Sequence, residues 1–149
     1  MSDLFPVLRV LGVLLCMFAL AMGLPLAVSL GHDDGVWQAY PLAMLVALGA
    51  GASLSWGLRR YKRELQPRHG VILVTLVWVL LPLCAALPLW LALQWVGRPV
   101  TFTHAYFEAV SGLTTTGSTV LSGVDALPLS VNVWRTFLQW LQIRWRVGD

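Results

Sequence analysis

The chain has 149 residues, of which 58% are hydrophobic and only 11% charged. A soluble domain of this size would be left with too little polar surface, so the composition indicates an integral membrane protein in contact with the lipid bilayer. The formal net charge is +3, but most of the ten Lys and Arg residues lie in short loops beside apolar runs, with no single basic face. Membrane topology explains this distribution better than nucleic-acid binding does.

Three uncharged stretches follow one another, at residues 10–30, 35–58 and 70–97. Each is long enough to cross a hydrocarbon core of about 30 Å as a helix that rises ~1.5 Å per residue. The first stretch is longer than the apolar part of a usual signal peptide and has no clear cleavage site, so we expect it to be a transmembrane helix. The third contains Pro82 and Pro88, which predict a tilt or a kink.

Charges in the loops predict the orientation. Residues 59–68 hold five of the ten basic residues, whereas residues 31–35 hold none and include two aspartates. Because basic residues are enriched in cytoplasmic loops, we expect the N-terminus and the 59–68 loop to be cytoplasmic. The loop that contains His32 and the region after Gly97 are then outside.

The second stretch contains small residues at a spacing of four, in the pairs Gly49/Ser53 and Gly51/Ser55. This spacing lets helix backbones approach closely in lipid. The simplest interpretation is packing between helices of the same chain, and a contact between two copies is the alternative.

After Gly97 the pattern changes. Residues 101–113 have helical character, with Thr101 or Thr103 as the N-cap and Gly112 near the end, but this helix is too short to span a membrane. A Thr/Gly segment follows at residues 114–119, then a loop through Asp125, and then an apolar helix from Leu129 onwards.

This order predicts a re-entrant pore loop. A helix that enters the membrane and stops midway has unsatisfied C-terminal carbonyls, which lipid tolerates only where they face water or an ion. The negative end of the helix dipole near Gly112 favours a cation, and the next segment can turn its carbonyls towards the same ion. Gly117 supplies the unusual backbone angles, and Thr hydroxyls add oxygen atoms. The alternative is an ordinary polar loop on the outside.

Glu108 is the acidic residue on this short helix, and in lipid such a group usually has a function or a partner. It either braces the filter through hydrogen bonds to Thr side chains or backbone amides, or it faces external water. His32, His69 and His104 lie in three separate loops without the spacing of metal ligands. No pairing of Ser, His and carboxylate suggests catalysis, so we do not expect an enzyme.

Residues 106–121 (YFEAVSGLTTTGSTVL) closely resemble the first pore loop of the Trk/Ktr/HKT superfamily, specifically that of the bacterial Trk membrane subunit. Residues 134–141 (WRTFLQWL) resemble the start of the next helix in that family. The resemblance implies an all-α integral membrane fold, with two leading helices followed by four repeats of helix, pore loop and helix around one potassium pathway. In this chain, residues 1–69 would hold the two leading helices and the basic cytoplasmic loop, and residues 70–149 the first repeat with its last helix truncated.

Within that repeat, the resemblance implies a transmembrane helix at 70–97, a pore helix at about 102–113, a filter at 114–119 and the start of a second helix at 129–149. The filter ligands of the family map most directly onto Thr115 and Thr116, with Thr114 and Gly117 beside them, chiefly through backbone carbonyls. The transported ion would be K⁺, and no organic cofactor is expected. Gly117 favours potassium, because plant relatives with Ser at this glycine tend to carry sodium.

The resemblance also implies partners and a location. Family members work with a cytosolic nucleotide-binding regulatory subunit and as homodimers, and they cross the bacterial cytoplasmic (inner) membrane several times.

The end of the chain departs from the family. Relatives continue with a glycine-rich stretch, whereas this chain ends in QIRWRVGD, where Arg144 and Arg146 would each cost about 2.5 to 3.5 kcal/mol in an apolar helix. We therefore expect a truncated or frame-shifted fragment that is inactive alone. The alternative function is a membrane anchor or assembly protein without transport, which gives no reason for a short helix that ends at a Thr/Gly segment.

Overall fold

The computed structural model describes residues 4–58, 67–98, 100–114 and 116–146, and the side chains of residues 67–68 and 142–146 are outside this description. Within these ranges the regular structure is entirely helical. Most of the basic loop predicted to be cytoplasmic, at residues 59–66, lies outside the described residues. The elements in chain order are α1 (Phe5–Ala21), α2 (Gly23–His32), α3 (Ala39–Gly57), α4 (Pro67–Trp95), α5 (Phe102–Leu113), the 3-10 helix η2 (Val124–Ala126) and α6 (Leu129–Arg146).

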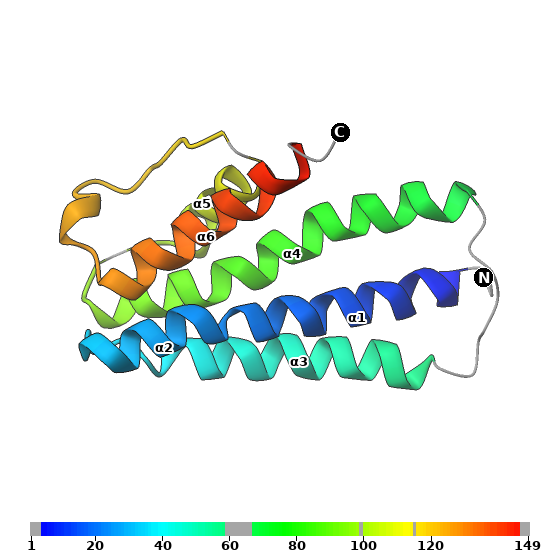
Figure 1. The fold of residues 1–149 in the computed structure, drawn as a ribbon, viewed down its shortest axis with the longest axis horizontal. Helices are drawn as coiled ribbons and strands as arrows, with labels where there is room; N and C mark the ends of the chain where they lie inside the picture. The colour runs from blue at the N-terminus through cyan, green and yellow to red at the C-terminus, as the bar shows by residue number, and fades with distance from the viewer. Residues whose placement is uncertain (1–3, 59–66, 99, 115, 147–149) are drawn as a thin grey trace.

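Helices α1, α3 and α4 lie side by side, and α5 and α6 lie along one side of α4 (Figure 1). One end of the molecule carries the start of α1, the end of α3 and the start of α4. The opposite end carries the α2–α3 loop, the end of α4 and the start of α6. Residues at positions 34 and 130 are thereby close in space although they are far apart in sequence.

Helices α1 and α2 form one candidate membrane span of 28 residues, Phe5–His32, with a break at Met22. Pro25 explains the break, because a proline lacks an N–H and its ring clashes with the carbonyl four residues earlier, here that of Ala21. The helix begins five residues before the uncharged stretch predicted from sequence. Arg9 set the N-terminal limit of that uncharged stretch, but a single charge near a helix terminus does not stop the helix.

The second and third candidate spans are Ala39–Gly57 and His69–Trp95. Helix α3 begins later than the apolar stretch because residues 35–38 are not helical. Gly35 has a φ of 76°, and a turn at residues 37–38 is closed by the Ala39 N–H, which donates to the Val36 carbonyl (3.0 Å). Helix α4 continues through Pro82 and Pro88 as one helix. Its end is closed at Gly97, where φ is 75° and the Arg98 N–H donates back to the Leu93 carbonyl (3.1 Å).

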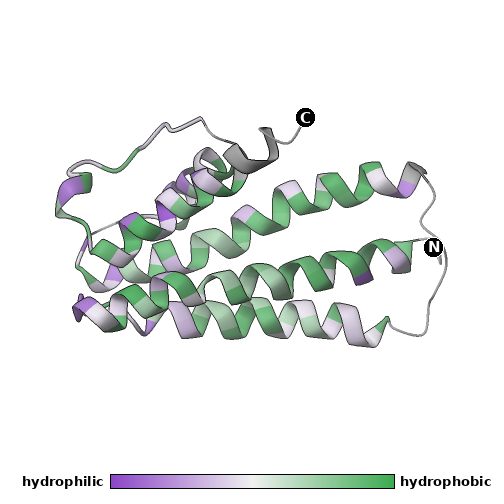
Figure 2. Cartoon of the chain, in the orientation of Figure 1, coloured by the Kyte–Doolittle hydropathy of each residue, from purple (hydrophilic) through white to green (hydrophobic). Residues whose placement is uncertain are grey.

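The outer surface of the long helices is apolar. Figure 2 shows hydrophobic residues along the visible side of α1, α3 and α4. Only 17% of the most apolar part of α4 is buried inside the chain, and large side chains such as Leu20, Leu45 and Val71 are at least 65% exposed. A helix that is hydrophobic on all sides is stable where lipid replaces water, so this surface fits a protein that crosses the membrane several times.

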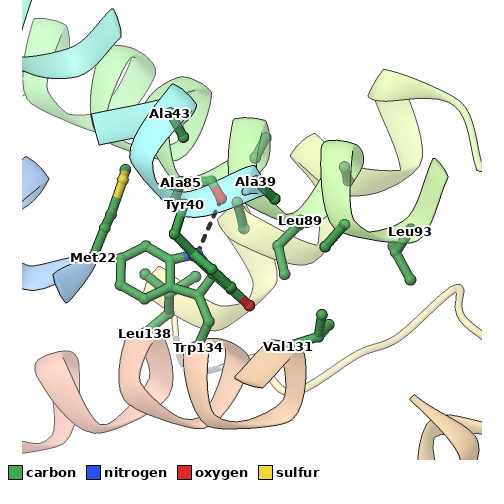
Figure 3. Packing of buried hydrophobic residues seen from close by; sticks show 14 of the residues in the cluster. Met22, Ala39, Tyr40, Ala43, Ala85, Leu89, Leu93, Val131, Trp134 and Leu138 are labelled. Carbon is green, nitrogen blue, oxygen red and sulfur yellow. Dashed lines mark hydrogen bonds between the residues drawn. The ribbon is translucent and has the colours of Figure 1, made fainter. Parts of the chain in front are cut away.

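The core forms where the two halves of the chain meet, around Trp134 of α6 (Figure 3). The indole is fully buried, and its N–H donates to the Ala85 carbonyl of α4 (3.1 Å). Its ring contacts Phe18 of α1 at 5.6 Å and Phe137 at 5.8 Å between centroids. Because one side chain contacts both α1 and α4, it fixes α6 on the long helices.

Two glycines set the distance between α1 and α3. A Cβ on Gly12 would lie 2.6 Å from the Gly51 carbonyl oxygen, and a Cβ on Gly51 would lie 2.7 Å from the Cys16 sulfur. The prediction that Gly51 permits close packing within the chain is confirmed. The Gly49/Ser53 pair does not make such a contact, because a Cβ on Gly49 would meet nothing within 4 Å and Ser53 is exposed.

Replacing Gly51 by Ala should therefore lower the thermal unfolding midpoint of the protein in detergent micelles. The added methyl group must push the two helices apart, at a cost of roughly 1 to 3 kcal/mol. Gly49→Ala is the matched control on the same helix, where the open position and the better helix propensity of Ala predict an unchanged or higher midpoint. Equal midpoints for the two variants would contradict this packing.

Candidate functional site

The site is built on α5, which is too short to cross a membrane. Its 12 residues extend ~18 Å. The side chain of Thr101 caps its start by accepting a hydrogen bond from the His104 N–H (3.3 Å), as one of the two predicted caps. At its end, the Thr114 hydroxyl donates to the Val110 carbonyl (2.8 Å).

After α5, the chain returns to the end of the molecule at which α5 begins. Figure 1 shows α5 leaving the end of α4 towards the middle of the molecule, and the following segment leading back to η2 and the start of α6. We call residues 116–123 the return segment. A short helix followed by a non-helical return is the geometry of a re-entrant loop.

Hydrogen bonds from the last turn of α5 hold the first part of the return segment. The Ser111 hydroxyl donates to the Ser118 carbonyl (2.7 Å), and the Ser111 carbonyl accepts from the Thr116 N–H (3.1 Å). The Thr114 and Thr116 hydroxyls are 2.8 Å apart. The structure thus brings together two of the predicted ligand residues, whereas Thr115 lies outside the described residues.

Gly117 has a φ of 69°, a conformation that other residues adopt only with strain. A Cβ at this position would meet nothing within 4 Å, so the backbone conformation rather than space requires a glycine. Thr114, Thr116 and Gly117 are all exposed in the chain. We call these three exposed residues the open face of the site.

Glu108 connects α5 to the far half of the return segment. Its carboxyl oxygen Oε1 accepts hydrogen bonds from the Thr119 hydroxyl (2.6 Å) and from the Val120 N–H (2.7 Å). The residue is only 4% exposed. Of the two readings of Glu108, the one in which it braces the segment is confirmed, and the one in which it faces external water is wrong.

The second carboxyl oxygen of Glu108 pairs with Arg135 of α6. Oε2 accepts from Nε at 3.0 Å and from Nη2 at 2.8 Å, with the two side chains 14% and 2% exposed. This two-point contact compensates a buried negative charge and ties α6 to the return segment. Sequence reasoning did not identify Arg135 as a site residue, although a charge on an apolar helix was the available signal.

Two further side chains hold the end of the return segment that leads into η2. The Arg98 guanidinium donates to the carbonyls of Ser122 (2.7 Å) and Gly123 (3.3 Å). The Asn132 side-chain amide donates to the Val124 carbonyl (3.0 Å) at the start of η2. The return segment is therefore held by Arg98, which follows α4, and by side chains of α5 and α6, while Thr116 and Gly117 stay exposed.

Helices α5 and α6 also approach each other closely at Gly112. A Cβ there would lie 3.1 Å from the Leu138 Cβ, so a larger residue would move α6 relative to α5. This contact and the Glu108–Arg135 pair lie between the same two helices.

The groups on the open face are hydroxyl and carbonyl oxygens. In the part of the chain that the structure describes, no group of three or more His, Cys, Asp or Glu residues is arranged to hold a metal ion. Neutral oxygen atoms without thiolate or imidazole groups are ligands for hard cations, and rings of carbonyls serve this purpose in cation filters.

Comparison with known families identifies the fold. The family model described as "TrkH: Cation transport protein" matches residues 38–144, which is more than half of the chain. The chain belongs to the TrkH family. This assignment agrees with the resemblance seen in residues 106–121 and with the all-helical membrane fold.

Two similar relatives are both named as potassium uptake proteins of the Trk system. The chain is 43% identical over 135 residues to the Trk system potassium uptake protein TrkH of Halomonas elongata and 39% identical over 132 residues to that of Escherichia coli K12. These matches cover 91% and 89% of this chain but only 27% of each relative. The chain therefore spans about a quarter of the length of these curated relatives.

A solved structure of the TrkH family has the same fold. The crystal structure of the potassium transporter TrkH from Vibrio parahaemolyticus superposes with a TM-score of 0.84 at 36% sequence identity. The match covers 93% of this chain and 29% of that protein.

Replacing Arg135 by Met should lower the unfolding midpoint strongly, because Glu108 is left as a buried charge without its counter-ion, at a cost of about 3 to 5 kcal/mol. In the double variant Glu108→Gln/Arg135→Met, the charge is absent and part of this loss should be recovered. Thermal melts in detergent measure both effects.

The matched control for this pair is Thr136→Ala, one residue further along α6. Thr136 is exposed, and its hydroxyl donates to the Asn132 carbonyl of its own helix (2.9 Å). If Arg135→Met melts at the same temperature as Thr136→Ala, the ion pair does not stabilise the site.

Proposed function

We propose that this chain forms the first helix, pore loop and helix of a potassium-conducting Trk-type pore, with residues 114–119 as one wall of the selectivity filter. The observation that carries the proposal is the re-entrant path of α5 and the return segment, which Glu108 and Arg135 hold in place. The names of the relatives as potassium uptake proteins support K⁺ as the transported ion. Transport alone changes no covalent bond, so no catalytic residue is assigned.

The ligands proposed for K⁺ are the backbone carbonyls of Thr114, Thr115, Thr116 and Gly117. A non-helical backbone at membrane depth is tolerated where it lines a water-filled path, which is the role an exposed Thr/Gly face would have. In this proposal, Glu108 and Ser111 contact the segment from behind and fix its conformation, and the ion approaches from the open side.

The proposed location is the bacterial cytoplasmic membrane, with the N-terminus inside and the α2–α3 loop outside. The basic composition of residues 59–68 and the two aspartates of the α2–α3 loop support this orientation. A cytosolic nucleotide-binding regulatory subunit and a homodimer mate are proposed as partners on the strength of the family resemblance. A membrane anchor without transport gives no reason for a buried ion pair behind a short re-entrant segment.

The filter assignment is tested by Gly117→Ser in a chimera, in which residues 1–141 of this chain replace the matching segment of Vibrio parahaemolyticus TrkH. A side chain at positive φ costs roughly 1 to 2 kcal/mol, so the carbonyls shift and the preference for potassium over sodium should fall by about tenfold. Competitive uptake of rubidium and sodium into cells measures this ratio.

Gly123→Ser is the matched control for backbone strain. Gly123 also has a positive φ, of 64°, but it lies at the outer end of the return segment beside Arg98. We expect this variant to lose stability without a change in the uptake ratio. If Gly117→Ser leaves the ratio unchanged, or if both variants lower it equally, residues 114–119 are not the filter.

Residues 1–149 expressed alone should not support potassium uptake, because one return segment with one open face cannot enclose an ion. Growth of a potassium-uptake-deficient bacterium at low potassium tests this, with the unsubstituted chimera as positive control and membrane insertion checked by fractionation. Rescue that is lost when Thr115 and Thr116 are replaced would show that copies of one unit assemble into a pore.

A further inference from the structure

A carboxylate in the α2–α3 loop binds the start of α6. Oδ2 of Asp34 accepts hydrogen bonds from the N–H of Ser130 (3.1 Å) and from its hydroxyl, across 96 positions of sequence. Oδ1 accepts from the Ser29 hydroxyl and from the Val36 N–H (3.4 Å). Both oxygens of one side chain are therefore used, one within the leading helices and one on α6.

The start of α6 needs such a partner. The first N–H groups of a helix have no carbonyl partner within the helix, and here the residue before it is Pro128, whose side chain cannot accept a hydrogen bond. A negative charge at this end is also favoured by the helix dipole. Asp34 thus acts as an N-cap supplied from a distant part of the chain.

The partially buried Asp34 carboxylate is surrounded by buried partners. Ser29 and Ser130 are fully buried and Val36 is 1% exposed. Burial alone would raise the pKa of the Asp34 carboxyl, but the hydrogen bonds from Ser130, Ser29 and Val36 lower it below its ordinary value of 3.8. The stabilisation that these hydrogen bonds give to the folded protein is present above that value and is lost only as the pH falls through the lowered pKa. Asp34 therefore keeps its hydrogen bonds as a carboxylate at neutral pH.

The bond connects to the return segment through α6. Ser130 lies five residues before Arg135, less than two helical turns away. Arg135 holds Glu108, and Glu108 holds the Val120 N–H. A shift of the outer end of α6 would therefore change the position of Arg135 relative to the carboxylate that braces the return segment.

We infer that Asp34 is a positioning residue for the return segment: it fastens the outer end of α6 to the leading helices and thereby keeps Arg135 on Glu108. The leading helices then contribute to the geometry of the filter without contacting it. The link from Asp34 to the return segment stands on the structure, and only its consequence for ion selectivity rests on the proposed function.

Hydrogen exchange measured by mass spectrometry on the full chain in nanodiscs tests the structural link. In Asp34→Ala, exchange should become about fivefold faster or more, the effect of losing a cap, at the first turn of α6. Exchange should also become faster at Val120 and Leu121, whereas Ala39–Gly57 should keep its rate. Asp34→Asn should show a smaller effect of the same kind, because one carbonyl oxygen replaces two acceptors.

Asp33→Asn is the matched control, since it removes the same charge from the same loop. Asp33 is exposed and has a φ of 49°, which Asn tolerates well. The inference is overturned if exchange changes only at the first turn of α6, if it rises equally in Ala39–Gly57, if Asp33→Asn has the same effect, or if nothing changes.

Selectivity in the chimera then separates this inference from the proposed function. We expect Asp34→Ala to lower the preference for potassium over sodium, with Asp33→Asn unchanged. If Gly117→Ser lowers the ratio and Asp34→Ala does not, residues 114–119 remain the filter and Asp34 does not position them. If neither variant lowers the ratio, the filter assignment fails and the role of Asp34 in selectivity falls with it, whatever the exchange rates show.

Discussion

The fully compensated carboxylate of Glu108 is the interaction on which the rest of the site depends. A buried charge in a membrane is costly unless it is paired, and Glu108 is satisfied by a hydroxyl, a backbone N–H and the Arg135 guanidinium. Two of these hydrogen bonds come from the return segment, and the one from the Val120 N–H gives a non-helical backbone group a partner that lipid cannot provide. The charge of Glu108 is therefore compensated, and the same side chain holds the return segment and links α5 to α6.

Close backbone contacts provide the second constraint. Lipid chains are as apolar as the helix surface, so the hydrophobic effect does not drive these helices together, and packing must do so. At Gly12 against Gly51, and at Gly112 against Leu138, the helices lie so close that an added Cβ would clash or be tightly packed. The large apolar side chains can then face outwards, while the buried indole of Trp134 fills the space where α1, α4 and α6 meet.

Much of this arrangement was predictable from local features. Length and hydropathy predicted three spans, because crossing a hydrocarbon core requires a run of about 20 apolar residues. The short helix, with Thr101 or Thr103 as its cap, followed from capping chemistry, and the structure shows Thr101 in this role. Gly117 was expected where the backbone takes a positive φ. The start of the first span at Phe5 was not predicted, because a count of uncharged residues stops at Arg9 although the helix does not.

The sequence by itself determined the membrane class, the order of helices and the chemistry of the Thr/Gly segment, because these depend on neighbouring residues and on composition. Only the tertiary structure decided that Arg135 is the partner of Glu108, that Gly12 lies against Gly51, and that Asp34 caps α6. These pairs depend on how each helix is rotated about its axis and on which helix ends meet. That information is absent from local patterns, because it arises only when helices distant in sequence pack together.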